Sequence, residues 1–213
     1  MKITKHAHAC IALDKDDCHL VIDPGAFTPN AAELVANTDT VLITHEHFDH
    51  FDEGMIAAAL DARPGLKVYG PSAVVEKLKS RAGQVVAVAE GDRFQVGEFD
   101  IAVFGKQHAR IHDDIPPFVN VGYLIDDRVF HPGDAYYVPP VSVEVLFLPT
   151  SGPWTKVGEA VDYVRAVNPK LLVQIHEVML SEIGQQSVAR IINPNMLSTV
   201  PLTIVPTGDS ITI

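Results

Sequence analysis

The chain has 213 residues, of which 47% are hydrophobic and 20% are charged, and this composition excludes a disordered protein and permits a sizeable core. The formal net charge of −11 disfavours a nucleic-acid partner, and no apolar run is long enough to span a membrane. The two cysteines are too few for a disulfide framework and no apolar leader follows Met1, so a cytoplasmic location is expected.

Short apolar and β-branched runs, separated by turns, predict strands along the whole chain. The first two runs, at 9–13 and 19–22, flank a polar stretch at 14–17 and are typical of a hairpin. Asp126 and Asp127 predict a second tight turn. The remaining strands are expected at 40–44, 66–69, 85–88, 93–96, 100–104, 119–125, 129–130, 145–148, 171–175, 202–205 and 210–213.

Helical patterns lie between these runs. Val157 and Val161 belong to a series of apolar residues at intervals of three and four, which is typical of a helix with one buried face. Ser72 and Ser181 are expected to cap their helices. The pattern favours an α/β fold in which two sheets pack together with helices outside. The expected helices span 30–36, 53–60, 72–81, 157–167 and 181–192.

A dense group of metal-binding side chains follows the predicted strand at 40–44. Three histidines and two acids occur within six residues: His45, Glu46, His47, Asp49 and His50. His45 and His47 share one side if the chain stays extended, and Asp49 and His50 return from the turn that follows. Imidazole and carboxylate groups suit zinc, iron or manganese. The alternative, a solvated loop, is disfavoured by the tight spacing behind a buried strand.

Four further motifs each place a metal-binding side chain at the end of a predicted strand. Asp23 closes the strand at 19–22, His108 follows 100–104, Asp134 lies in a His-Pro-Gly-Asp turn after 129–130, and His176 follows 171–175. Five motifs therefore occur in order along most of the chain, between Asp23 and His176.

In this order the motifs resemble the metallo-β-lactamase-fold superfamily. His45 to His50 match its H-x-H-x-D-H signature, and Asp134 matches the aspartate of its Gly-Asp turn. The small ascorbate-6-phosphate-lactonase-like metal-dependent hydrolases are the most similar subgroup, because His8-Ala9-Cys10 resembles their early histidine element and 148–153 resembles their Leu-Pro turn.

The resemblance implies a four-layer αββα sandwich that forms a single domain over 1–213. It also implies two divalent metal ions, with zinc expected first and manganese or iron as alternatives. His45, His47 and His108 would hold one ion, Asp49, His50 and His176 the other, and Asp134 would bridge them. Asp49 and Asp134 are the expected catalytic residues, with Asp49 as an acceptor for the proton of the attacking water. Asp23 is expected to orient a ligand rather than to bind metal.

Several neighbouring residues have two interpretations. His112 would replace His108 as a ligand if the strand ended later, and we prefer His108 because the run at 101–104 leads directly into it. His8 either lines the site or is an ordinary histidine, and Cys10 is expected to be a buried thiol. His131 is expected to have a structural role. Three aromatic residues either wall the substrate pocket or pack elsewhere: Tyr136, Tyr137 and Trp154.

The expected function is metal-assisted hydrolysis of a small ester, lactone or phosphoester. A nuclease of the same fold is one alternative, but it would need a basic clamp that this acidic chain lacks. A non-hydrolytic metal-binding or redox protein is the other. We expect a small-molecule substrate, no nucleic-acid or membrane partner, and, by analogy only, a possible homo-oligomer.

Overall fold

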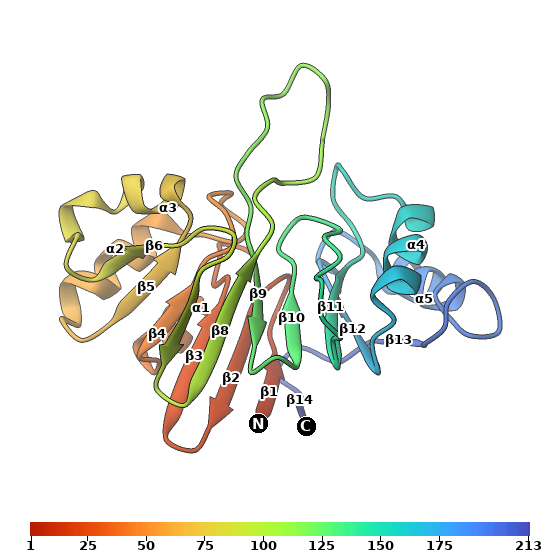
Figure 1. The fold of residues 1–213 in the computed structure, drawn as a ribbon, viewed down its shortest axis with the longest axis horizontal. Coiled ribbons are helices and arrows are strands. Elements are labelled where there is room, and N and C mark those ends of the chain that lie inside the picture. The colour runs from red at the N-terminus through yellow and green to blue at the C-terminus, as the bar shows by residue number, and fades with distance from the viewer.

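The computed structural model describes residues 1–213, which form two seven-stranded sheets (Figure 1). The first sheet has the order β14 (Ser210–Thr212), β1 (Lys2–Lys5), β2 (Ile11–Lys15), β3 (Cys18–Ile22), β4 (Thr40–Leu42), β5 (Lys67–Gly70) and β6 (Val85–Ala87). The second has the order β13 (Leu202–Thr203), β12 (Leu171–Ile175), β11 (Val145–Pro149), β10 (Val129–His131), β9 (Gly122–Ile125), β8 (Phe99–Phe104) and β7 (Arg93–Val96).

The central strands are apolar on both faces because each face packs against another layer. In β11, Val145 and Phe147 belong to the core between the sheets, whereas Leu146 and Leu148 pack on the helix side. This alternation follows from the two-residue period of a strand, and a strand buried on both faces reads as a continuous apolar run.

Five α-helices cover the outer faces of the two sheets. The first sheet carries α1 (Ala31–Ala36), α2 (Glu53–Ala62) and α3 (Ser72–Lys77), and the second carries α4 (Val157–Val167) and α5 (Glu182–Ile191) (Figure 1). The predicted αββα sandwich is therefore confirmed. No helix in the structure has both the length and the apolar character needed to cross a membrane.

Parallel pairing brings many loops to one edge of the sandwich. Strands β3 to β6 run parallel in the first sheet, and β10 to β13 run parallel in the second. Ligand sites of open α/β sheets form at such carboxyl ends. The loop between β8 and β9 leaves this edge and projects beyond the sandwich (Figure 1).

Two local predictions are confirmed by their backbone geometry. Asp126 and Asp127 both lie in the left-handed region, with φ of 52° and 53°, as a two-residue hairpin turn of the primed type requires. Ser181 caps α5, where its side chain accepts a hydrogen bond from the backbone N–H of Gly184.

Other element boundaries differ from the sequence prediction. The expected helix at 72–81 ends at Lys77 and continues only as a short 3₁₀ turn, and its N-cap is Pro71 rather than Ser72. The strand expected at 40–44 ends at Leu42, because the chain turns into the loop that carries the histidines. Strand β1 was not predicted, since two of its four residues are lysines.

Candidate metal centre

All seven residues that the sequence predicts as metal ligands lie at the carboxyl-end edge of the sandwich. The loop after β4 supplies four of them, and one each follows β8, β10 and β12. Five of the side chains are buried, while His47 and Asp49 are partly exposed at the mouth of the site. Residues up to 131 positions apart in sequence are thus brought together by the topology.

The first group of converging side chains contains His45, His47 and His108. One ring nitrogen of each lies within 4.8 Å of the others, and Nε2 of His45 is 3.1 Å from Nδ1 of His47. Burial lowers the pKa of His45 and of His47, so both rings are neutral near pH 7. Two neutral rings at this distance can share one hydrogen bond, and a cation that binds both nitrogens would replace it.

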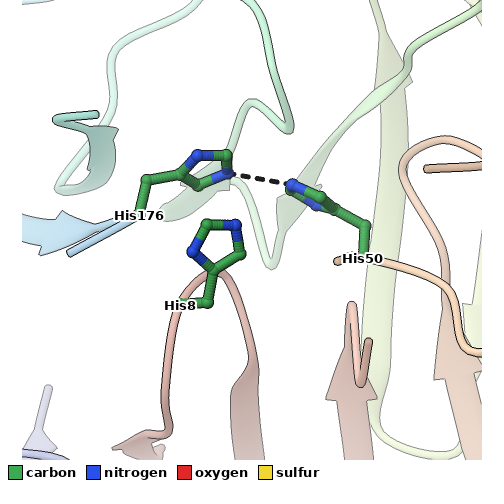
Figure 2. A group of neighbouring side chains, drawn as sticks. All are labelled: His8, His50 and His176. Carbon is green, nitrogen blue, oxygen red and sulfur yellow. Dashed lines mark hydrogen bonds between the residues drawn. The ribbon is translucent and has the colours of Figure 1, made fainter. Parts of the chain in front are cut away.

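The second group is built around His50, His176 and Asp134. Nε2 of His50 lies 2.9 Å from Nε2 of His176 (Figure 2), and Oδ1 of Asp134 lies 3.0 Å and 2.7 Å from these two nitrogens. Asp49 approaches from the rim, with its Oδ2 3.9 Å from Nε2 of His50.

Asp134 faces both groups. Its Oδ1 contacts the second group, and its Oδ2 lies 3.3 Å from Nε2 of His108 in the first. Although burial alone would raise it, the pKa of Asp134 is held well below its usual range by His176 and His50. The carboxylate is therefore ionised, as a group that binds two cations must be.

Hydrogen bonds to the outer side of each ring turn the inner nitrogen toward the site. Four of the rings donate from Nδ1 to an oxygen behind them: His45 to Oγ1 of Thr44 (3.0 Å), His50 to Oδ2 of Asp23 (2.7 Å), His108 to the backbone oxygen of Ala109 (2.5 Å) and His176 to that of Ser151 (3.1 Å). When such a ring is neutral, its single proton is donated to this oxygen and Nε2 presents its lone pair inward. Metal-binding histidines are oriented in this way.

Asp23 connects this arrangement to the backbone. Its fully buried carboxylate accepts hydrogen bonds from the backbone N–H of Thr44 at 2.8 Å, from the Thr44 hydroxyl at 2.7 Å and from the His50 ring. These are the contacts that the predicted orienting role requires. His50 is the one side chain of the two groups to which Asp23 is hydrogen-bonded.

The residues present fit a metal pair. Nε2 of His108 and Oδ1 of Asp134 are buried and have no hydrogen-bond partner, a state that native proteins avoid unless another group satisfies the atom. Ligands about 2.0–2.1 Å from a zinc ion lie roughly 3.3 Å apart in a tetrahedral site. The donor spacings of 2.7–3.3 Å around Asp134 are close to that value.

Three residues around the site adopt a backbone conformation that sequence patterns do not reveal. His8, Asp23 and His176 have φ of 61°, 49° and 61°, in the left-handed region that residues other than glycine seldom occupy. Such conformations cluster at functional sites, where the surrounding structure compensates for the strain.

The structure also separates the alternatives that the sequence left open. His112 is exposed in the projecting loop beside Asp114, so His108 is the histidine that reaches the centre. Nε2 of His131 pairs with the backbone oxygen of Ala9 at 2.8 Å, a structural contact. Cys10 is completely buried, which raises its pKa to about 12 and makes it unreactive.

Trp154 has a closer relation to the site than the sequence could show. Its indole Nε1–H donates a hydrogen bond to Oδ2 of Asp134 at 2.8 Å, although Trp154 lies 20 residues further along the chain. Tyr136 instead donates to the backbone oxygen of Pro149 at 3.1 Å, which is a packing contact. No spacing signal in the sequence links Trp154 with Asp134.

We expect Trp154→Phe to weaken metal binding by about 10–100-fold, the usual cost of removing an outer hydrogen bond to a ligand. Phenylalanine keeps most of the aromatic packing but cannot donate to Asp134. Competition with a chromophoric chelator measures the affinity, and Tyr136→Phe is the matched control because its hydroxyl bonds only to backbone. Equal affinities for the two variants would contradict this role.

Gly25 allows the histidine loop to approach the end of β3. A Cβ atom at this position would overlap the backbone of Asp49 and His50. We therefore expect Gly25→Ala to displace the loop, to lower the melting temperature and to reduce the number of bound metal ions. Gly65→Ala is the control, since a Cβ there meets no atom within 4 Å. Similar melting temperatures for the two variants would refute the prediction.

Comparisons with known proteins agree with this geometry. The family described as "Beta-lactamase superfamily domain" matches residues 2–176. Protein Rv0786c of Mycobacterium tuberculosis is 35% identical over 85% of this chain and 86% of its own length. A UPF0173 metal-dependent hydrolase of Thermoplasma volcanium is 25% identical over 83% of each chain.

Solved structures show the same fold. Igni18, described as a metallo hydrolase from Ignicoccus hospitalis, aligns with a TM-score of 0.74 at 19% identity, covering 99% of this chain and 97% of its own. The prediction of a metal-dependent hydrolase is confirmed at the level of the family, which includes relatives of that name. The chain belongs to the β-lactamase superfamily.

Proposed function

We propose that this protein is a hydrolase that holds two divalent metal ions and cleaves a small ester, lactone or phosphoester. The observation that carries the proposal is the position of Asp134, whose two oxygens face two separate groups of histidines. His45, His47 and His108 would hold one ion, Asp49, His50 and His176 the other, and Asp134 both. Zinc is the first candidate, and manganese or iron also suit these donors.

When bound, such ions lower the pKa of water and stabilise the negative charge that develops on the substrate. The protein residues supply position and hydrogen-bond acceptance. Asp49 is partly exposed at the mouth. Burial would raise its pKa, but the hydrogen bond from His8 and the charges of His50 and His8 together lower it to about 2. The carboxylate is therefore ionised near neutral pH, as a metal ligand must be, but a group of such low pKa is a weak base. Its proposed part in catalysis is to hold an ion and to accept a hydrogen bond from the attacking water.

A cavity next to the centre supports a small-molecule substrate. It has a volume of about 480 Å³, within the usual range for ligand pockets, and is lined by residues of the projecting loop between β8 and β9. His108, Phe118 and Arg110 form part of its wall, so the cavity shares His108 with the first group of histidines. The cavity offers apolar contacts together with a charged pair, Arg110 and Asp113, whose side chains lie 2.9 Å apart.

The two alternatives receive less support. A nuclease needs a basic surface, and the net charge of −11 provides none. A redox role needs a second cofactor or a partner that supplies one. A single domain over 1–213, a cytoplasmic location and a homo-oligomer stay predictions.

A screen of lactones, phosphodiesters and thioesters, run with protein loaded with zinc or manganese, tests this function. We expect turnover of at least one class, loss of activity with a chelator and recovery when metal returns. Activity that persists in chelator would contradict the proposal, as would a metal-loaded protein that turns over no class. Salt-sensitive binding of RNA would favour the nuclease alternative instead.

A further inference from the structure

His8 lies at the metal centre although it matches no ligand of the family signature. It lies between β1 and β2, and its side chain is fully buried. Its ring lies beneath the gap between His50 and His176 (Figure 2), with its centroid 4.0 Å from that of His176. A nitrogen of His8 lies within 4.8 Å of the nitrogens of both rings.

The backbone of His8 is fixed from both sides. Its N–H donates to Oε1 of Glu177 at 3.0 Å, and its carbonyl accepts from the N–H of His176 at 3.1 Å. Glu177 is held in turn by Lys5, whose buried Nζ lies 2.8 Å from the same oxygen. A buried ion pair costs desolvation energy, and here it stabilises a left-handed residue beside the second group of ligands.

The ring of His8 points its Nε2 at Asp49. The distance to Oδ2 of Asp49 is 2.9 Å, and because a carboxylate only accepts, the ring nitrogen donates. The outer nitrogens of His45, His50, His108 and His176, and Oδ2 of Asp134, each have an orienting hydrogen-bond partner. For Asp49, the corresponding partner is His8.

We propose that His8 is a positioning residue of the second metal position, where its Nε2–H holds Oδ2 of Asp49, the oxygen that lies 3.9 Å from Nε2 of His50, and so fixes this carboxylate beside the proposed ion. The inference rests on the second metal position of the proposed function. The backbone contacts of His8 with His176 and Glu177 hold the His8 ring at a fixed position relative to the end of β12. A partly exposed acid on a loop, such as Asp49, would otherwise sample several rotamers.

Metal titrations of His8→Ala and His8→Gln test this role. Zinc and manganese affinities are measured by competition with a chromophoric chelator, and elemental analysis gives the number of ions per chain. We expect His8→Ala to weaken the binding of the second metal ion about 10–100-fold, the usual effect of losing a hydrogen-bond partner of a metal ligand. The affinity for the first ion should be unchanged. His8→Gln retains an N–H donor and should restore most of the affinity. His6→Gln, a buried histidine of the same segment, should bind like the wild type.

Two results would overturn the proposal. His8→Ala could bind both equivalents like the wild type, which would make His8 an ordinary core residue. His8→Gln could instead be as weak as His8→Ala, which would mean that the ring itself is a ligand. A wild-type protein that binds fewer than two ions would refute the proposed function rather than this inference.

A measurement on the wild type covers the case in which the variants do not fold. Nitrogen-15 spectra of the histidine rings in zinc-loaded protein report which nitrogen of each ring carries the proton. We expect Nε2 of His8 to stay protonated when two zinc ions are bound. A metal bound to either nitrogen of the His8 ring, Nε2 or the buried and unpartnered Nδ1, would overturn the assignment.

Discussion

Asp134→Asn is expected to reduce kcat/KM by about 10³-fold or more on any substrate that the wild type hydrolyses. The amide keeps the shape of the side chain but removes the negative charge between the two groups of histidines. Its N–H₂ group can also donate a hydrogen bond to Nε2 of His50 or of His108, which occupies a lone pair that a metal ion would need. We therefore expect the metal content to fall below two ions per chain.

Steady-state kinetics and elemental analysis of the same preparation measure this effect. Asp113→Asn is the matched control for metal content, because Asp113 is an exposed acid of the projecting loop, with 79% of its side chain accessible. Asp113→Asn should retain the wild-type metal content. Full activity of Asp134→Asn would mean that Asp134 does not hold the metals and that the proposed chemistry is wrong.

Asp23→Ala is expected to lower the free energy of unfolding of the metal-free protein by about 3 kcal/mol, since it leaves three buried donors without an acceptor. These donors are the N–H and hydroxyl of Thr44 and Nδ1 of His50. For a chain of this size the melting temperature should fall by roughly 6–12 °C. The affinity for the second metal ion should also fall, because His50 loses the group that orients it.

Thermal unfolding in excess chelator separates this effect from metal loss. Asp23→Asn is the comparison variant, because an amide oxygen can still accept hydrogen bonds from Thr44. The melting temperature of metal-free Asp23→Asn should therefore lie between those of Asp23→Ala and the wild type. An unchanged melting temperature for metal-free Asp23→Ala would show that the hydrogen bonds of Asp23 do not stabilise the fold.

The fold and the residues of the site could be predicted because their signals are local or lie in a fixed order. His45 to His50 carry their own spacing, and β11 reads as a buried strand because both of its faces are apolar. Asp134 and His176 follow recognisable strand ends. The topology then brings these ends to one edge, which is a property of the fold class rather than of any single residue.

Other features could not be predicted because they depend on contacts between distant segments. The role of Trp154 depends on one hydrogen bond to Asp134, and the place of His8 depends on contacts with the His176–Glu177 segment at the other end of the chain. Strand β1 was missed because Lys5 looks like a surface residue, although the structure buries it against Glu177. Ordinary residue preferences favour the surface for a lysine.

The charge of the centre explains why it suits cations. Burial alone would lower the pKa of His50, but the carboxylates of Asp134 and Asp23 raise it well above its usual range. The buried carboxylates thus attract a positive charge, which a proton supplies when no metal is bound. Divalent ions would displace that proton, so metal binding should release protons and weaken as the pH falls.

Anomalous diffraction from crystals grown with zinc or manganese tests the central claim most directly. We expect two peaks per chain, one among His45, His47 and His108 and one beside His50 and His176, with Asp134 between them. A single peak, or none at metal concentrations that saturate the protein in solution, would contradict the dinuclear centre on which the proposed hydrolase depends.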